Sequence, residues 1–306
     1  MQNDLIKSMK TFGKRVGKNA RERWRSFTPQ EKKILPLFHL LMAIMSIWGL
    51  LPMLYLVINS CKDVVEYNVN FSSWPAHFHW QNFVQAFEMT YRNTTILGMF
   101  ANSFVYVFTF SVGNTFCSCM TAYALTRYHF KGRAFLNTFA LVVQMIPIYG
   151  SGTAGYQLCY QLGLIDNLPL LWVTGASGFD YTFLIVSSYF RVVSWDYAEA
   201  AFMDGAGNWY VFTRIMMPMV MAPVLVLWLN NVTALWNDYM TPMLYLPNFP
   251  SLSSGIYNLR ALAAFVKGGT TTYFAGMVIS FVPVSFLFIW LQKKIMGLKF
   301  EGGLKG

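Results

Sequence analysis

Six long apolar segments run along this chain, and each approaches the length that a helix needs to cross a bilayer. The hydrocarbon core of a membrane requires about 20 helical residues. These segments lie near residues 37–60, 95–123, 134–160, 168–190, 216–235 and 273–292. Only 12% of the residues are charged, whereas a soluble domain carries about 25%. The sequence therefore predicts an all-α polytopic membrane protein with six transmembrane helices.

The basic residues are concentrated on one side of this predicted topology. If both termini share a side, that side carries 19 of the 23 Lys and Arg residues. The opposite side carries only Lys62, Arg92, Arg260 and Lys267. Such a bias marks the cytoplasmic side of a membrane protein. The net charge of +10 thus indicates sidedness rather than nucleic-acid binding, and both termini are predicted to be cytoplasmic in a bacterial-type cell membrane.

This topology divides the chain into three parts. Residues 1–36 form a basic N-terminal tail, residues 37–292 a transmembrane domain, and residues 293–306 a cytoplasmic C-terminal tail. Two external loops are expected at 61–94 and 237–272, and both are aromatic and poor in charge. Such loops suit docking to another protein, or to the membrane interface, better than free solvation.

The end of the basic tail contains a helix-start signal. Thr28 and Glu31 form a capping box, with Pro29 at the first helical position, so a helix is predicted to begin at Pro29. The tail upstream is predicted either to lie on an anionic membrane surface or to be a solvated tail. The sequence favours neither interpretation.

A polar hairpin at residues 194–218 separates two of the apolar segments. Ser194 is suited to be an N-cap, and Asp196 places a carboxylate at the positive end of a helix. Gly205 lies where such a helix would end in a left-handed residue. Asn208 is expected to open a second helix that continues through Arg214 into the next span. The charge bias places this hairpin in the cytoplasm.

The sequence lacks the residues of an enzyme site. A phosphate-binding loop with GxxxxGK[ST] spacing is missing, so any ATP hydrolysis must come from a partner. The four cysteines form no CxxC pair, and His77 and His79 alone are too few for a metal site. We expect no catalytic residue, no metal and no cofactor bound by this chain.

Polar residues inside the predicted spans are the other candidates for function. Asp180 is the one carboxylate well inside a span, where a charge is costly. It is predicted to be either a pathway residue or part of a buried pair, and both remain open. Asn102, Asn114, Asn230 and Asn231 are more typical of hydrogen bonds between helices.

The hairpin resembles the EAA motif of ABC importer permeases. That motif consists of EAA, three residues, G, nine residues, I, one residue, and LP. The same spacing is filled here by Glu199, Ala200, Ala201, Gly205, Ile215 and Pro218, with Met217 in the place of leucine.

Further segments are similar to carbohydrate permeases of the MalG type. Residues 118–133 resemble the loop after the second core helix of that group, and Trp236, Asn237 and Asp238 resemble its WND or WNE triplet. The glycine-bearing ending at 297–306 is also similar. The resemblance covers about residues 37–306. The long basic tail is a departure from the family pattern, and the resemblance gives it no function.

The resemblance implies a type I ABC importer permease that forms half of a translocation pathway for a sugar or oligosaccharide. The implied partners are a second homologous permease in a heterodimer, two cytoplasmic ATPases that bind ATP and Mg²⁺, and an extracellular solute-binding protein that is expected to be a lipoprotein. The implied ATPase-coupling residues are Glu199, Ala200, Ala201, Phe202, Met203, Asp204, Gly205, Ile215 and Pro218. Candidate substrate-pathway residues are Asp180, Tyr181, Trp236, Asn237 and Asp238.

Two alternative functions remain. An ABC importer permease for a non-carbohydrate solute would share the hairpin and differ elsewhere. A proton-coupled secondary transporter would titrate Asp180, but that class usually shows internal repeats and more spans, and it does not explain the hairpin. The identity of the sugar does not follow from the sequence.

Overall fold

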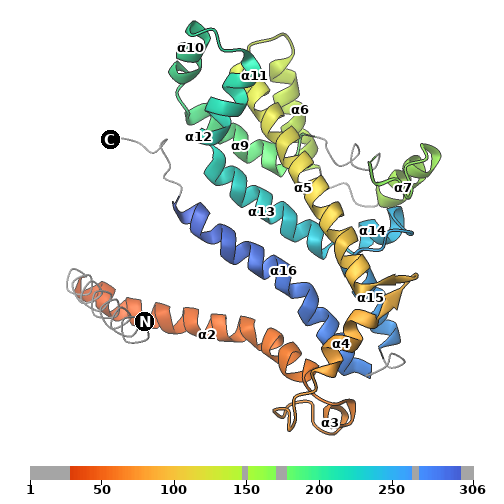
Figure 1. Cartoon of the computed structure of the whole chain (residues 1–306). Helices are drawn as coiled ribbons and strands as arrows, with labels where there is room; N and C mark the ends of the chain where they lie inside the picture. Colours follow the sequence, from red (N-terminus) through yellow and green to blue (C-terminus); the bar gives the residue numbers. More distant parts are fainter. Residues whose placement is uncertain (1–27, 147–150, 170–177, 264–268, 298–306) are drawn as a thin grey trace, which may run out of the picture. The chain divides into compact units, whose positions relative to one another are not determined.

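The computed structural model describes residues 28–146, 151–169, 178–263 and 269–297. The chain falls into two compact units, residues 1–57 and 58–306, and each is described by itself. Helix α2 (Pro29–Ser60) supplies the described part of the first unit and ends in the second (Figure 1). It begins at Pro29, as the capping box predicts. Its residues 34–60 are long and apolar enough to cross a membrane.

The second unit is almost entirely helical. After a short segment it contains, in order, α3 (Val64–Val69), α4 (Gln81–Glu88), β1 (Thr90–Tyr91), β2 (Thr94–Thr95), α5 (Ile96–Arg127), α6 (Arg133–Met145) and α7 (Ser151–Gln161). It continues with α9 (Tyr181–Val192), α10 (Asp196–Met203), α11 (Asn208–Tyr210), the π-helix η1 (Val211–Met216), α12 (Met217–Met219), α13 (Met221–Asn237), α14 (Met240–Tyr245), α15 (Leu252–Leu262) and α16 (Gly269–Gly297).

Helix α5 is the element on which the second unit packs. Its 32 residues would span about 48 Å, well beyond a hydrocarbon core of about 30 Å. Helices α9 and α13 pack along it, and their side chains form one buried apolar cluster that includes Phe183, Phe190 and Val224. The same cluster extends to Ala198 of α10. The long helix therefore connects the membrane-spanning part of the unit to the hairpin.

Polar side chains also join these helices. The indole N–H of Trp228 donates to Ser111 Oγ at 3.1 Å. The amide of Asn231 donates to the hydroxyls of Thr115 at 3.4 Å and Thr182 at 3.3 Å. Hydrogen bonds of this kind help helices to associate in lipid. Asn231 thus has the interhelical role that the sequence favours.

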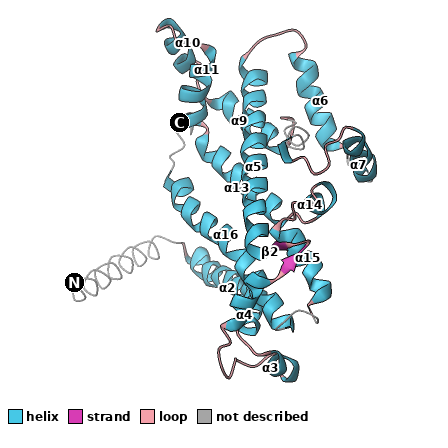
Figure 2. Ribbon diagram, turned by 45° about the vertical axis from the view of Figure 1, so that its right-hand side comes forward, coloured by secondary structure: helices cyan, strands magenta, loops and turns pink. Residues whose placement is uncertain are grey.

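The other end of α5 lies against the predicted external loops. Strands β1 and β2 pair through a two-residue turn (Figure 2). Both turn residues have positive φ, 48° at Arg92 and 62° at Asn93, as a type I′ hairpin requires. Arg92 Nη1 donates to Pro247 O at 2.8 Å. This contact ties the first external loop to the second.

The spans agree with the sequence in part. Within the described residues, α2, α5 and α16 are long and apolar enough to cross a membrane, and a bent pair formed by residues 208–219 and 221–237 would be a fourth. The expected third and fourth spans include residues 147–150 and 170–177, which lie outside the described residues. The total of six spans therefore stays a prediction.

The second helix of the hairpin does not run straight into the next span, contrary to the expectation. It passes from α11 through the π-helix η1 to α12, and then bends by 83° before α13. Val220 at the bend has φ −105° and ψ 12°, outside the helical region. Pro218 and Pro223 flank the bend, and each lacks the N–H that would continue a helical ladder. Helix α13 therefore begins at Met221 rather than at Met216.

Candidate functional site

The turn after α10 folds as its sequence predicts, whereas the N-cap position of α10 is taken by Trp195 rather than by the expected Ser194. The Ser194 hydroxyl accepts a hydrogen bond from the Asp196 N–H at 3.3 Å, where α10 begins. At the other end Gly205 has φ 85°. Its N–H donates to Phe202 O at 3.0 Å, and the Ala206 N–H donates to Ala201 O at 2.9 Å. These two bonds define a Schellman motif, which requires a left-handed residue at Gly205.

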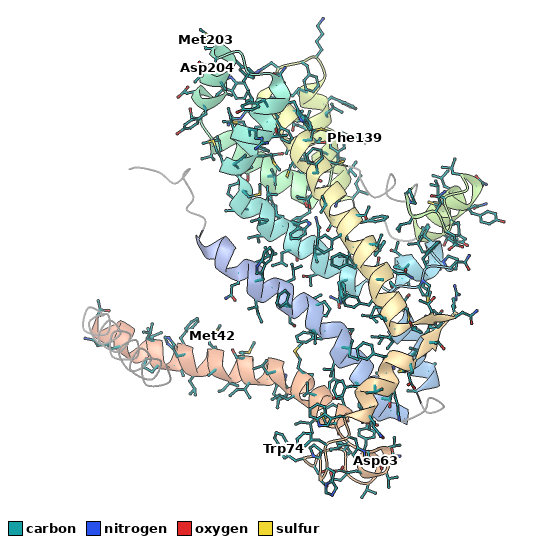
Figure 3. All side chains as sticks on the ribbon, viewed as in Figure 1. Met42, Asp63, Trp74, Phe139, Met203 and Asp204 are labelled. Carbon is teal, nitrogen blue, oxygen red and sulfur yellow. The ribbon has the colours of Figure 1, made fainter. Side chains whose placement is uncertain are left out.

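Helix α10 has an exposed face and a buried face. Glu199, Ala200 and Asp204 are exposed, and the Met203 side chain is 88% exposed. Figure 3 shows Met203 and Asp204 at the outer end of the helix. Tyr197, which is not among the EAA motif residues, is also exposed on α10. The exposed face thus offers two carboxylates, a thioether, a phenol and the small side chain of Ala200 to a partner.

The buried face packs on the rest of the unit. Ala198 is fully buried, and Ala201 and Phe202 are half-buried against the apolar cluster. The Phe202 ring lies 6.1 Å from the ring of Trp195. Phe202 is therefore turned toward its own protein, whereas Met203 is free to meet a partner. Ala198 and Trp195 hold α10 in place, and the motif gives no signal for either.

The remaining two motif residues lie after the turn. Ile215 belongs to the π-helix η1 and packs against the apolar cluster. Pro218 is exposed in α12, next to the 83° bend. A π-helix is uncommon and is often found at functional sites. These two positions determine the path of the chain behind α10 rather than extending its exposed face.

Asp180 caps the N-terminus of α9. Its Oδ1 accepts from the Phe183 N–H at 2.9 Å and from the Ser118 hydroxyl at 2.7 Å. Its Oδ2 accepts from the Asn114 amide at 3.0 Å. Asp180 therefore lies where α9 begins rather than within a continuous helix. Both its oxygens are engaged by donors, two of them on α5.

The other pathway candidates are dispersed. Tyr181 is 57% exposed, and Asn237 is exposed with its amide donating to Thr233 O at 2.8 Å. Asp238 Oδ1 accepts from the N–H groups of Met240 and Thr241, both at 3.0 Å, at the start of α14. Its Oδ2 accepts from the Tyr106 hydroxyl at 3.3 Å. Tyr181 follows Asp180 directly in the chain, but the hydrogen-bond partners of Asn237 and Asp238 given above do not include Asp180.

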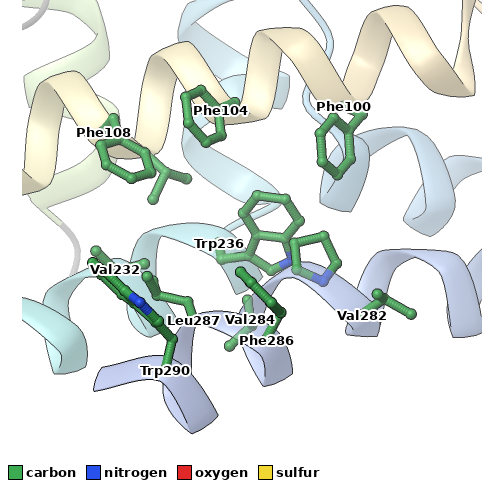
Figure 4. A pocket seen from close by; sticks show the side chains of 12 residues that line it. Phe100, Phe104, Phe108, Val232, Trp236, Val282, Val284, Phe286, Leu287 and Trp290 are labelled. Carbon is green, nitrogen blue, oxygen red and sulfur yellow. The ribbon is translucent and has the colours of Figure 1, made fainter. Parts of the chain in front are cut away.

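Trp236 faces an apolar cavity of about 520 Å³ between α5, α13 and α16 (Figure 4). The lining is entirely apolar and includes Phe100, Phe104, Phe108, Trp236, Phe286 and Trp290. The indole N–H of Trp236 donates to Ser280 O at 3.0 Å. A sugar needs polar partners for its hydroxyl groups when it leaves water. This cavity therefore suits apolar side chains or lipid better than a carbohydrate.

The fold resembles that of a solved transporter. The structure titled "Crystal structure of a bacterial ABC transporter involved in the import of the acidic polysaccharide alginate" contains a chain that matches with a TM-score of 0.73 at 20% sequence identity. The match covers 87% of this chain and 98% of that chain. At this identity the likeness shows the fold, which is that of a type I ABC importer permease.

Related sequences point to the same family. The galactooligosaccharides transport system permease protein GanQ of Bacillus subtilis is 32% identical over 199 residues, which cover 63% of this chain and 69% of GanQ. The diacetylchitobiose uptake system permease protein NgcG of Streptomyces coelicolor is 25% identical over 282 residues, with 91% of each chain covered. Residues 114–296, more than half of the chain, match the model of one family. This chain therefore belongs to the family of binding-protein-dependent transport system inner membrane components.

Proposed function

We propose that this chain is a permease subunit of an ABC importer for a sugar or oligosaccharide, and that α10 is its contact with the ATPase. The observation that carries the proposal is α10 itself. It is a short helix with an exposed face at Glu199, Met203 and Asp204, fixed on a buried cluster that continues along α5 and α9. A protruding helix with a rigid base suits the transfer of force. It contributes no catalytic group.

The printed names of its relatives support a carbohydrate as the transported solute. GanQ is described as a galactooligosaccharides permease, NgcG as a diacetylchitobiose permease, and a further relative, from Bacillus subtilis, as a maltodextrin permease. The alginate transporter with the similar fold also carries a saccharide polymer. We infer the solute class from this agreement. None of these four names supports the non-carbohydrate alternative.

The proposed topology has six spans with both termini in the cytoplasm. In support, α10 and the α5–α6 turn lie at one end of the second unit, and α3 and α4 lie at the other (Figure 1). The predicted topology assigns 19 of the 23 basic residues to the side of the hairpin. On this proposal residues 1–36 and 293–306 are cytoplasmic tails around a transmembrane domain at 37–292. The loops at 61–94 and 237–272 are external.

The proposed complex contains a second homologous permease, two ATPases that bind ATP and Mg²⁺, and an extracellular solute-binding protein. ATP-driven closure of the ATPases moves α10, and the helices above it change from inward-facing to outward-facing. The exposed carboxylate of Glu199 suits a basic groove on the ATPase, and Met203 suits an apolar pocket beside it. We also propose that the binding protein is a lipoprotein and that the two permeases form a heterodimer.

Two substitutions in the hairpin test this function. Glu199→Lys reverses the charge at the proposed contact, and Gly205→Pro imposes a φ of about −65° where the turn has 85°. Gly205→Pro also removes the N–H that donates to Phe202 O. We expect solute uptake to fall at least tenfold in both. Co-purification of the ATPase subunit with the permease should weaken, while the amount of permease in the membrane stays unchanged.

Glu88→Lys is the matched control. It makes the same charge reversal on an exposed residue of α4, at the other end of the unit. This variant should retain its ATPase. Wild-type uptake in both hairpin variants would exclude α10 as the coupling element. The solute itself would be identified by mass spectrometry of the ligand that co-purifies with the binding protein.

The secondary-transporter alternative predicts a different energy source. Uptake that continues without ATP hydrolysis, and that a protonophore abolishes, would support it. The capping bonds of Asp180 with Phe183, Ser118 and Asn114 favour a structural role for this carboxylate instead. The importer proposal expects uptake to stop when the ATPase is inhibited.

A further inference from the structure

The turn between α5 and α6 makes contacts that the transport proposal does not yet use. Arg127, the last residue of α5, donates through Nη2 to the carbonyl oxygens of Phe190 and Val193. These carbonyls lie at the C-terminal end of α9. The last carbonyls of a helix lack partners within it and carry partial negative charge, so a guanidinium stabilises them. Arg127 thus fixes the end of α9 to the end of α5.

The same guanidinium lies over an aromatic ring. The Cζ atom of Arg127 is 5.4 Å from the ring centroid of Trp195, within the range of a cation–π contact. Trp195 immediately precedes α10. Its ring also lies 6.5 Å from those of Tyr123 and Tyr128, and 6.1 Å from Phe202. The Arg127 side chain therefore joins the end of α5 to the end of α9 and to the residue that precedes the proposed coupling helix α10.

The next residue of the turn fixes the second half of the hairpin. The Tyr128 hydroxyl donates to Asn208 Oδ1 at 3.0 Å, where α11 begins. Two consecutive residues, Arg127 and Tyr128, therefore contact the start of α10 and the start of α11. Between these two points lies the turn at Gly205, whose added Cβ would meet no atom within 4 Å. The hairpin is fixed at its base and open at its tip.

The neighbouring arginines do not make this arrangement. Arg133 donates through Nε to Leu125 O at 2.7 Å and through Nη2 to Thr126 O at 3.0 Å, so it caps α5 itself. The side chain of Arg191 is exposed and forms no hydrogen bond with any residue that the structure describes. Among these residues, Arg127 is the one that joins α5, α9 and the hairpin.

We propose that Arg127 is a positioning residue that makes α10 move as one body with α5 and α9. Without it, α10 keeps the packing of Ala198, Ala201 and Phe202 on the apolar cluster. It loses the cation–π contact with Trp195 and the link to the carbonyls at the end of α9, so it rotates more easily against α9. A force applied to Glu199 or Met203 would then turn α10 instead of displacing the core helices. This inference rests on the proposed function of α10 as the coupling element.

The test measures coupling in the intact transporter, purified with its ATPase and supplied with its own binding protein. We compare wild type with Arg127→Met, Arg127→Lys and Trp195→Leu. Arg127→Met should retain the ATPase subunit and its basal ATP hydrolysis. Its stimulation by the solute-loaded binding protein should fall at least tenfold. Arg127→Lys should recover part of the stimulation, because an ammonium keeps the charge but cannot form the planar fork.

Arg191→Met is the matched control, since it removes an exposed arginine from the end of the same helix. It should be stimulated like wild type. The double variant Arg127→Met with Trp195→Leu should lose less stimulation than the sum of the two single effects, because both substitutions remove the same cation–π contact.

Three results would overturn the inference. The first is wild-type stimulation in Arg127→Met. The second is loss of stimulation together with the ATPase subunit, which would mean a purely structural role. The third applies if Arg127→Met does not accumulate in the membrane: it is wild-type stimulation in both Arg127→Lys and Trp195→Leu. Failure of the proposed function can be distinguished from failure of this inference. If α10 is not the coupling element, Glu199→Lys behaves as wild type, independently of the result for the Arg127 variants.

Discussion

At the scale of single residues, Lys62 is unusual because it is fully buried. It lies just after α2, in the loop that leads to α3, and its Nζ donates to Asn70 O at 3.1 Å and Phe71 O at 3.2 Å. Burial lowers the pKa of this lysine from its ordinary value, and the charge of Glu66 opposes the shift in part. Lys62 thus fixes the exposed part of the first external loop at the cost of desolvating an ammonium.

This burial predicts a pH dependence of stability. Because the pKa is lowered in the folded state, the folded protein binds fewer protons than the unfolded chain between the lowered value and 10.5. The free energy of unfolding therefore rises with pH across that window, by at most about 1.4 kcal/mol per pH unit. Below this window Lys62 is charged in both the folded and the unfolded state, so the cost of burying the ammonium lowers the free energy of unfolding in full.

Thermal unfolding of the purified protein in detergent, from pH 7 to pH 10.5, would measure this effect. Lys62→Met removes the titrating group, and Lys62→Arg keeps a charge that does not titrate in this range. Both variants should lack the rise in melting temperature that Lys62 gives the wild type at alkaline pH. Melting curves that shift in parallel for all three proteins would contradict the prediction.

At the scale of elements, the start of α9 depends on a cap inside the predicted membrane region. Asp180 satisfies the Phe183 N–H and receives two further donors from α5. Gly178, two residues earlier, has φ 69°, and a Cβ there would lie 2.7 Å from Thr121 Oγ1. The approach of the chain to α9 is therefore fitted closely to α5. Helices α5 and α9 owe their alignment at this point to polar contacts as well as to apolar packing.

This cap gives a prediction for two substitutions. Asp180→Ala removes the acceptor for the Phe183 N–H and for two buried side-chain donors, so it should destabilise the protein by about 2–4 kcal/mol. Asp180→Asn should cost less, because its oxygen can still accept from Phe183 and Ser118. Asn114 Oδ1 has no hydrogen-bond partner among the described residues, so a turned Asn114 amide would accept from the new amide group.

The two variants are compared by thermal unfolding and by uptake. Asp180→Asn should retain most of the stability and its association with the ATPase. If Asp180→Asn were as stable as wild type and yet abolished uptake, the pathway role of Asp180 would be supported over the capping role. Equal stability of Asp180→Ala and wild type would exclude the capping role.

At the scale of the whole molecule, the two ends of the second unit are expected on opposite sides of the membrane. Met203 of α10 is 88% exposed, and Trp74 in the first external loop is 76% exposed. In a variant with all four native cysteines replaced, Trp74→Cys should react with a membrane-impermeant maleimide in intact cells. Met203→Cys should react only after the membrane is permeabilised. Ala198→Cys, at a fully buried position of α10, is the control that should stay unlabelled in both cases.

Labelling of Met203→Cys in intact cells would place α10 outside and would contradict both the topology and the coupling role. In the assembled complex the same cysteine should be protected relative to the isolated permease, because the proposed ATPase covers it. If Glu199→Lys removes this protection, the labelling result and the loss of ATPase co-purification would have the same cause.

Local signals determined much of this protein from the sequence alone. The start of α2 at Pro29, the beginning of α10 near Ser194 and the left-handed turn at Gly205 each depend on residues within one or two helical turns. Hydropathy over about 20 residues likewise identifies a spanning helix. These features rest on near neighbours in the chain, and the composition of a short segment is therefore sufficient to predict them.

Contacts between distant segments were decided only by the tertiary structure. The residues joined by the Ser118–Asp180 and Tyr128–Asn208 hydrogen bonds are 62 and 80 positions apart in the chain. The inward turn of Phe202 and the place of Arg127 over Trp195 likewise depend on how α5 packs against α9. The 83° bend before α13 is also absent from a simple hydropathy pattern. Such pairs form because helix packing brings side chains together, and one sequence does not specify which faces will meet.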